Sequence, residues 1–185
     1  MDRRRTTKYM KKVFLFPAFA FIPLAMVCCT TMAERGTEPL GSPPVITHSF
    51  ASKELSHGDL WKIYVEAHDP DGDMRHFVCV LKQVGYGYYP SEYVIINKRH
   101  RGKMKGYLTF NSATGGGLGL TEWTQLELKV YIRDRGRKTS NEVIFPLVLS
   151  RGSKETPPPP PFDISGLERL GAISIMLKDE RKGVR

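Results

Sequence analysis

Apolar side chains recur at every second position in two stretches of this chain, residues 61–67 and 126–132. Successive side chains of a β-strand point to opposite faces, so this spacing places the apolar residues of each stretch on one face. The two apolar sets are Trp61, Ile63, Val65 and Ala67, and Leu126, Leu128, Val130 and Ile132. A chain that contains two such strands is expected to fold as β-sheet with one face of each strand buried.

Five further segments are rich in β-forming residues, and turn residues separate the segments every ten to fifteen positions. The strands expected from them are 45–51, 75–83, 93–97, 106–111 and 143–149. No helical periodicity lies between them. The sequence therefore predicts an all-β domain over residues 45–151, an immunoglobulin-like antiparallel β-sandwich of about seven strands.

Two of these segments carry further information about their position in a sheet. Residues 77–81 are apolar at every position, which predicts a central strand whose outer face is also covered, with the C-terminal tail as the candidate cover. Pro146 lies on the outward side of the last strand. Because proline has no N–H to donate, this strand is expected at the border of its sheet.

The first 33 residues have the composition of a secretory signal peptide or a short membrane anchor. A basic head precedes residues 13–29, which contain no charged residue and are close to the shortest length that spans a bilayer. Thr31 and Ala33 are small residues at the positions that signal peptidase recognises, which fits cleavage after Ala33. Cys28 and Cys29 are candidates for lipidation, although neither follows the small residue of a lipobox. Cleavage, acylation and an uncleaved anchor remain open, and each predicts export with an N-terminal membrane association.

The formal net charge of +9 is concentrated at the N-terminus. Residues 1–28 hold six basic residues and one acid, which leaves +4 for the rest of the chain. A charge this small gives no support to a nucleic-acid partner. Of the three cysteines only Cys79 lies in the predicted domain, so the domain has no intrachain disulfide, and we expect Cys79 to be a small buried hydrophobic residue.

Three carboxylates crowd into the turn at residues 69–73, between two of the expected strands. Asp69, Asp71 and Asp73 repel one another unless a cation, basic side chains or water neutralise them. The same sequence is also good turn chemistry, because aspartates bond their own backbone, Pro70 presets φ and Gly72 supplies a positive φ. An ion site and a plain turn are both consistent with this segment.

In an immunoglobulin-like sandwich the turn after residue 133 lies at the same end as this acidic turn. Asp134 is then expected beside Asp69, Asp71 and Asp73, and four carboxylates at one rim predict a calcium site, to which Asn141 adds a carbonyl. In the alternative without calcium, Arg75 and Arg133 neutralise the carboxylates.

The order of these features resembles cadherin-like and PKD-like immunoglobulin-fold domains of bacterial surface proteins. The resemblance covers residues 44–150 and rests on the acidic turn, on Asp134-Arg135-Gly136 at the end of a late strand, and on Ser140-Asn141 before the last strand. The tryptophan and Gly-Asp-Gly motif of the PKD core is absent. The resemblance therefore implies the broad superfamily and its sandwich fold.

Tyrosines at four positions predict a stacking surface for a sugar ring or a protein partner, since tyrosine offers amphipathic contact area. These candidate ligand-binding residues are Tyr86, Tyr88, Tyr89 and Tyr93. An ordinary packed loop is the alternative. The basic segment 98–105 similarly fits either an anionic surface or a solvated loop or edge.

The chain outside the domain consists of linkers and a tail. Residues 34–44 and the proline-rich residues 152–161 are expected to be linkers, and residues 162–185 form a C-terminal tail. Within the tail, residues 171–177 alternate like a short apolar strand. This strand is expected either to dock on its own sheet or to add to the sheet of a partner.

Together these features predict an exported bacterial envelope module in the periplasm, outer envelope or cell surface, which binds a protein partner and catalyses no reaction. No residue lies in a recognisable nucleophile or acid–base motif. One alternative is a carbohydrate-binding module with calcium as its only candidate cofactor. Another is an accessory subunit of an envelope enzyme or protein complex.

Overall fold

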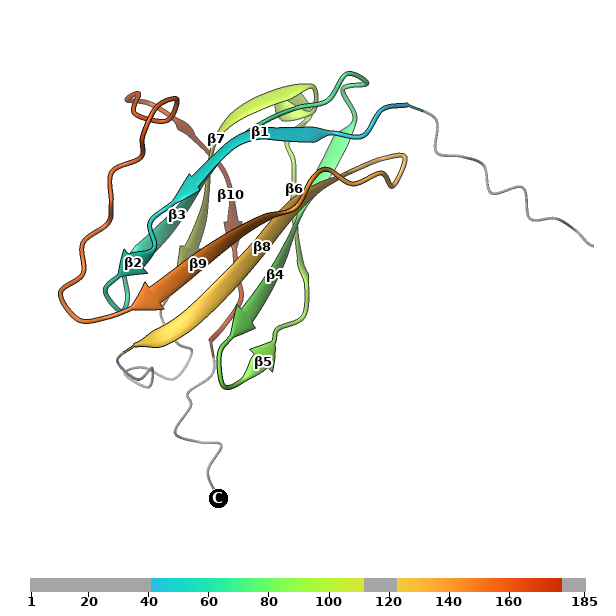
Figure 1. Cartoon of the computed structure of the whole chain (residues 1–185). Helices are drawn as coiled ribbons and strands as arrows, with labels where there is room; N and C mark the ends of the chain where they lie inside the picture. The colour runs from blue at the N-terminus through green and yellow to red at the C-terminus, as the bar shows by residue number, and fades with distance from the viewer. Residues whose placement is uncertain (1–40, 112–122, 178–185) are drawn as a thin grey trace, which may run out of the picture. The chain divides into compact units, whose positions relative to one another are not determined.

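The computed structural model describes residues 41–111 and 123–177 (Figure 1). These residues form ten strands and one short 3-10 helix. The elements are β1 (Val45–Ala51), β2 (Glu54–Leu55), β3 (Leu60–His68), β4 (Met74–Gln83), β5 (Gly87–Tyr88), β6 (Glu92–Ile95), η1 (Lys98–His100), β7 (Lys103–Asn111), β8 (Thr124–Asp134), β9 (Val143–Leu149) and β10 (Glu168–Ile173).

The strands form two sheets. Sheet A has the order β1-β3-β7-β10, and sheet B has the order β2-β9-β8-β4-β5, with β6 also paired to β4. The pairings are antiparallel except β10 with β7 and β2 with β9, which are parallel. The predicted all-β sandwich is confirmed. It has ten strands rather than seven because β2, β5 and β10 join as short additional strands.

The core lies between the two sets of alternating apolar residues, 61–67 and 126–132, that the sequence shows. Trp61, Ile63, Val65 and Ala67 of β3 and Leu126, Leu128, Val130 and Ile132 of β8 are all buried. The Trp61 indole Nε1 donates to the Ser52 carbonyl at 2.8 Å, and its ring meets Phe110 edge-on. The two sets therefore form opposite walls of one core, as their alternation predicts.

The basic segment after β6 is only partly a loop. β7 begins at Lys103, so the last residues of this segment belong to an inner strand of sheet A. Met104 is buried, while Lys105 points outward and pairs with Glu66 of β3 at 3.7 Å. The alternation of inward and outward side chains thus extends into the basic segment, with Lys103 and Lys105 on the outer face of β7.

Strand β4 is buried on both faces, and the cover on its outer face is not the tail. Val78 is fully buried on the outer face of sheet B, where the register places Tyr93 on one side and Tyr131 on the other. The tail pairs with sheet A instead. The expectation that the tail covers this strand is wrong, because tyrosines of the neighbouring strands bury it laterally.

Strand β9 lies at the border of sheet B over most of its length. It pairs with β8 throughout, but among the described residues β2 reaches it only at Val148 and Leu149. The N–H of Val148 donates to the Lys53 carbonyl, just before β2, at 2.8 Å. Backbone groups two residues apart point to the same side of a strand, so the nitrogen of Pro146 faces the same border of the sheet. The position predicted for Pro146 is confirmed.

The C-terminal tail docks on its own domain. β10 pairs with β7, and Leu170, Ile173 and Leu177 enter the core. The strand covers Glu168–Ile173, earlier than the expected residues 171–177. Both glycines at the contact are needed: a Cβ on Gly106 would lie 2.2 Å from the Glu168 carbonyl oxygen, and one on Gly171 would lie 2.4 Å from Val94.

The linker before β10 covers the outer face of sheet A. Phe162 is buried against Tyr64, with ring centroids 5.6 Å apart, and Glu155 pairs with Lys62 at 3.3 Å. Thr156 donates its N–H to the Ser52 hydroxyl at 3.0 Å. The chain therefore buries Tyr64, the aromatic side chain that β3 presents on its outer side.

The predicted signal or anchor, including Cys28 and Cys29, lies outside the described residues, as does the glycine-rich segment at 115–119. Within residues 41–111 and 123–177, no helix is long and apolar enough to cross a membrane.

Candidate functional site

The acidic turn between β3 and β4 is held by its own backbone. The Asp69 carboxylate accepts the N–H of Asp71 at 3.1 Å and the N–H of Asp73 at 3.2 Å. Gly72 adopts φ +70°, a conformation that favours glycine. Asp69 is buried, and Asp71 accepts the N–H of Ser42. The turn chemistry predicted from the sequence is present.

Asp134 converges on this turn, as the sandwich topology predicts. Arg135, the next residue, donates its N–H to the Asp73 carbonyl at 3.2 Å. Burial raises the pKa of Asp73 above its ordinary value, and the hydrogen bond with Asp69 and the negative charges of Asp134, Asp69 and Asp71 raise it further. Asp73 therefore favours its protonated form more strongly than an exposed aspartate does.

The other groups proposed for this site lie elsewhere. Asn141 binds β1, with its Oδ1 accepting from the Ile46 N–H at 2.9 Å and its Nδ2 donating to the Ile46 carbonyl at 3.1 Å. Arg75 and Arg133 act on the charge of His76 rather than on Asp73. Among the described residues, no group of three or more His, Cys, Asp and Glu side chains is arranged to hold a metal ion.

These contacts favour the plain turn over a calcium site. We expect calcium at ~1 mM, a concentration that saturates extracellular modules, to leave the melting temperatures of the parent and of Asp71→Ala unchanged, because Asp69 already binds backbone N–H groups. Differential scanning fluorimetry with and without a chelator measures this. A calcium-dependent rise in the parent that Asp71→Ala abolishes would restore the ion site.

The four tyrosines do not form one platform. Tyr89 is buried and its hydroxyl donates to Gln83, while Tyr86 packs against Tyr89 with ring centroids 5.2 Å apart. Tyr88 of β5 and Tyr93 of β6 are exposed on the outer face of sheet B. Their partners in β4, Lys82 and Val78, are four residues apart, so the two tyrosine positions lie about 13 Å apart along the strand.

The outer face of sheet B carries several large exposed apolar side chains. They are Tyr88 (68% exposed), Tyr93 (51%), Ile95 (71%) and Ile144 (55%). The strand register places them around a strip that contains Val78, Val80 and Tyr131 of the two central strands. We call this surface the apolar face of sheet B. Neither the described part of the tail nor η1 pairs with it.

A group of positive charges lies at one end of this face. The register places His76 of β4 between Ile95 of β6 and Arg133 of β8. Burial lowers the pKa of His76 below its ordinary value, and the charges of Arg75, Arg133 and Arg101 lower it further. We call these three arginines and His76 the arginine cluster.

The arginine cluster was missed in the sequence because its members are far apart along the chain. Arg75 and His76 lie at a β-bulge in β4, Arg101 follows η1, and Arg133 is near the end of β8. Alternation does place Arg133 on the outer face. Only the pairing register brings it opposite His76.

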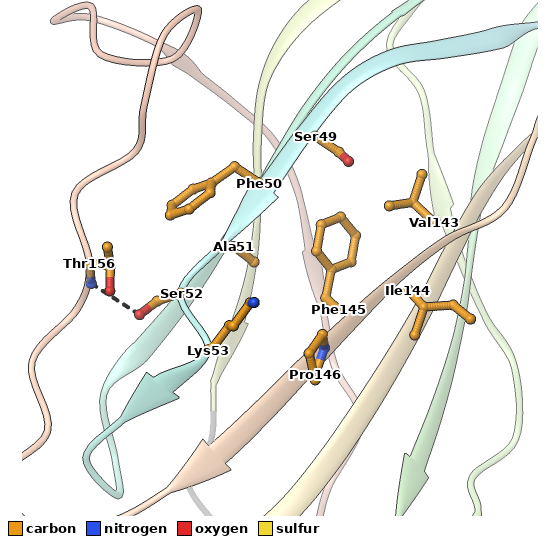
Figure 2. A pocket seen from close by; sticks show the side chains of 10 residues that line it. All are labelled: Ser49, Phe50, Ala51, Ser52, Lys53, Val143, Ile144, Phe145, Pro146 and Thr156. Atoms are coloured by element: carbon orange, nitrogen blue, oxygen red, sulfur yellow. Dashed lines mark hydrogen bonds between the residues drawn. The ribbon is translucent and has the colours of Figure 1, made fainter.

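A groove of about 360 Å³ separates β1 from β9. Figure 2 shows Phe50 and Phe145 on its two sides, with Ile144 and Pro146 along β9 and the Thr156–Ser52 hydrogen bond at one end. The walls are apolar, and Lys53 is the one charged side chain among the lining residues. Pro146 at the sheet border removes a donor that an added strand would need.

A second hollow of about 450 Å³ lies under the linker, where Tyr64, Tyr107 and Phe162 meet residues 163–167. Lys62 reaches its rim and is paired with Glu155. The aromatic side chains are already in contact with one another, with Tyr64 and Tyr107 centroids 5.8 Å apart. This hollow belongs to the docking of the tail.

Cys79, the one free cysteine among the described residues, is fully buried between the sheets. Burial raises its pKa to about 12, with a smaller contribution from Glu92. The thiol therefore stays protonated at neutral pH and cannot serve as a nucleophile. The prediction of a small buried hydrophobic residue is confirmed.

No protein-family model matches the sequence, and no curated protein matches it. Among solved structures, the chain is similar to the PKD domain of an M14-like peptidase from Thermoplasmatales archaeon SCGC AB-540-F20, at 10% sequence identity and a TM-score of 0.38. The match covers 60% of this chain and 99% of that chain. The strand pairing itself gives the immunoglobulin-like β-sandwich of this chain.

Proposed function

We propose that this chain is a non-catalytic binding module of the bacterial cell envelope, and that it recognises a protein partner through the apolar face of sheet B. The observation that carries the proposal is the contrast between the two sheets. On sheet A the tail buries the outward aromatic residue Tyr64 under Phe162. On sheet B, Tyr93 and Ile95 remain more than half exposed.

Single exposed apolar side chains are common on every protein surface and need no explanation. Several of them gathered on one face are typical of an interaction site. Tyrosine and aliphatic residues in the centre with charges at the rim are the usual composition of a protein interface. The arginine cluster and Lys82 supply such a rim. A rigid sheet also loses little conformational entropy on binding, because strands β4 and β8 are already fixed by pairing on both sides.

Export is the other half of this proposal, and it rests on residues 1–33. The basic head and the uncharged run that follows are the features of a signal peptide or anchor. A domain without disulfides, held by a core of packed side chains, folds independently of the redox state of the compartment. An accessory subunit of an envelope enzyme is one form that such a binding module takes.

A carbohydrate-binding module is the second candidate, because Tyr88 and Tyr93 are exposed on the same face. Their separation of about 13 Å along β4 suits an extended polymer better than a single sugar ring. Glycan-array binding that Tyr88→Ala and Tyr93→Ala each abolish would favour this candidate over a protein partner.

Site-specific photo-crosslinking in envelope fractions tests the main proposal. A photoreactive residue at Ile95 is expected to give one discrete protein adduct. The same residue at Leu60, an exposed aliphatic position (47% exposed) on sheet A, is the matched control and is expected to give none. Equal labelling at both positions, or none at Ile95, would contradict a protein-binding role for this face.

A further inference from the structure

The arginine cluster holds positive charge that the described residues do not neutralise. The ion pairs of the described residues include Arg99 with Glu168 and Lys129 with Glu142, but none joins Arg75, Arg101 or Arg133 to a carboxylate. The acid next to Arg133 along the chain points the other way. Asp134 follows Arg133 in β8 and is buried on the inner side, where its Oδ1 accepts the N–H of Lys138 at 2.7 Å.

The cluster also contains an unsatisfied donor. The Nε of Arg101 is buried and has no hydrogen-bond partner. A buried donor without a partner costs free energy, and a donor on a charged group costs more. The backbone of Arg101 is fixed, since its carbonyl accepts the N–H of Met74 at 3.3 Å and its N–H donates to the Lys98 carbonyl at 3.4 Å. The unmet donor and the lack of a carboxylate partner leave the charge of Arg101 uncompensated by the described residues.

Apolar side chains adjoin the cluster on the same face. The His76 ring meets Tyr93 edge-on with centroids 5.9 Å apart, and Ile95 lies directly opposite His76 in the β4–β6 pair. A ligand bound at Arg133 and His76 is therefore within reach of an aromatic ring and an exposed isoleucine. The partner surface must carry negative charge next to an apolar side chain.

We infer that the arginine cluster binds carboxylates of an acidic segment of the partner protein, while an apolar side chain of that segment packs on Tyr93 and Ile95. This inference rests on the proposed function and names the chemistry of the partner. The guanidinium fork matches a carboxylate with two parallel hydrogen bonds, which supplies orientation as well as attraction. The apolar contact supplies the hydrophobic part of the interface.

An acidic polypeptide fits this surface better than an acidic glycan does. Guanidinium groups only donate hydrogen bonds, whereas sugar hydroxyls need acceptors as well as donors. Ile95, the most exposed of the aliphatic side chains here, offers no stacking surface for a sugar. It does offer the aliphatic contact that a protein side chain uses.

The test is an NMR titration of the full chain at low salt with poly-L-glutamate, with a polyuronate and with inorganic phosphate as probes. We expect poly-L-glutamate to bind most tightly and to shift the signals of His76, Tyr93 and Ile95. Arg75→Gln/Arg133→Gln is expected to weaken that binding about tenfold or more, because charge-assisted hydrogen bonds are among the strong ones. Lys53→Gln/Arg151→Gln removes the same charge from exposed positions elsewhere and is expected to have no such effect.

The imidazole of His76 gives a second readout. Burial and the charges of Arg75, Arg133 and Arg101 hold the pKa of His76 below its ordinary value, and its ring meets Tyr93 edge-on. A bound carboxylate offsets the arginine field, so the pKa of His76 is expected to rise in the complex. Arg133→Lys keeps the charge but loses the fork, and is expected to bind with intermediate affinity while melting like the parent.

Three results would overturn the inference. They are tighter binding of the polyuronate than of poly-L-glutamate, equal binding by the double variant and its control, and an unchanged His76 pKa at saturation. Cross-linking from Ile95 separates the two proposals. An adduct that survives in Arg75→Gln/Arg133→Gln would sink the acidic-segment inference alone, whereas no adduct in the parent would sink the binding role itself.

Discussion

Replacing Trp61 with alanine is expected to lower the free energy of unfolding by about 3–5 kcal/mol, the usual cost of deleting a large buried aromatic side chain. Trp61 is fully buried and packs edge-on against Phe110. Its removal leaves a cavity between the sheets and takes the hydrogen bond from the buried Ser52 carbonyl. Urea unfolding followed by circular dichroism measures the loss.

The chain contains its own control for this experiment. Trp123, the second tryptophan, is 67% exposed, and Trp123→Ala is expected to change the free energy of unfolding by no more than about 0.5 kcal/mol. Trp61→Phe is expected to fall between the two, since it keeps part of the volume but loses the indole N–H. A loss below about 1 kcal/mol for Trp61→Ala would contradict its place at the centre of the core.

Removal of residues 157–185 is expected to destabilise the domain and leave it monomeric. The deletion takes away Phe162, Leu170, Ile173 and Leu177, which are all buried. Each contributes about 1.5–3 kcal/mol of apolar burial. The entropy of ordering the tail offsets part of this, so the net loss is expected to be on the order of 3–5 kcal/mol. Thermal unfolding and size-exclusion chromatography with light scattering are the measurements.

A point substitution tests the same contact without shortening the chain. Gly106→Ala places a Cβ against the Glu168 carbonyl oxygen, a backbone atom that cannot move cheaply, so β10 is expected to detach. Cleavage by trypsin at Arg169 then becomes faster. Gly102→Ala is the matched control, because its Cβ would come no closer than 3.7 Å to Gly72.

Two other outcomes of the deletion would be informative. An unchanged melting temperature in a monomer would mean that the tail contributes little to the fold. A changed assembly state with an unchanged melting temperature would mean that β10 serves a partner, the other use that its sequence allows.

The strands and the core could be predicted from the sequence because both follow from local patterns. Alternation alone identified the inward faces of β3 and β8, with Trp61 among their residues. The acidic turn was also predictable, since Asp69 bonds its own backbone over four residues. Its meeting with Asp134 required only the general topology of a sandwich.

The candidate site was much less predictable, because cross-strand register decides it. Four tyrosines close together in the sequence were expected to act as one group, but Tyr89 turns into the core and binds Gln83. The two that remain exposed on sheet B share its outer face with Ile95, which no sequence pattern singled out. In the alternative without calcium, Arg133 was expected to neutralise the acidic turn. It directly precedes Asp134, so alternation turns it to the opposite face, toward His76.

The sequence by itself determined that this chain forms strands, which of their faces are buried, and that a turn of aspartates joins two of them. Those properties depend on residues a few positions apart, whose side chains a strand's period of two sorts onto faces. Only the tertiary structure decided that the tail pairs with sheet A, that sheet B keeps an apolar face, and that the charges of three arginines act on His76. Such contacts join residues far apart along the chain, and the register of strand pairing, which no local pattern specifies, brings them together.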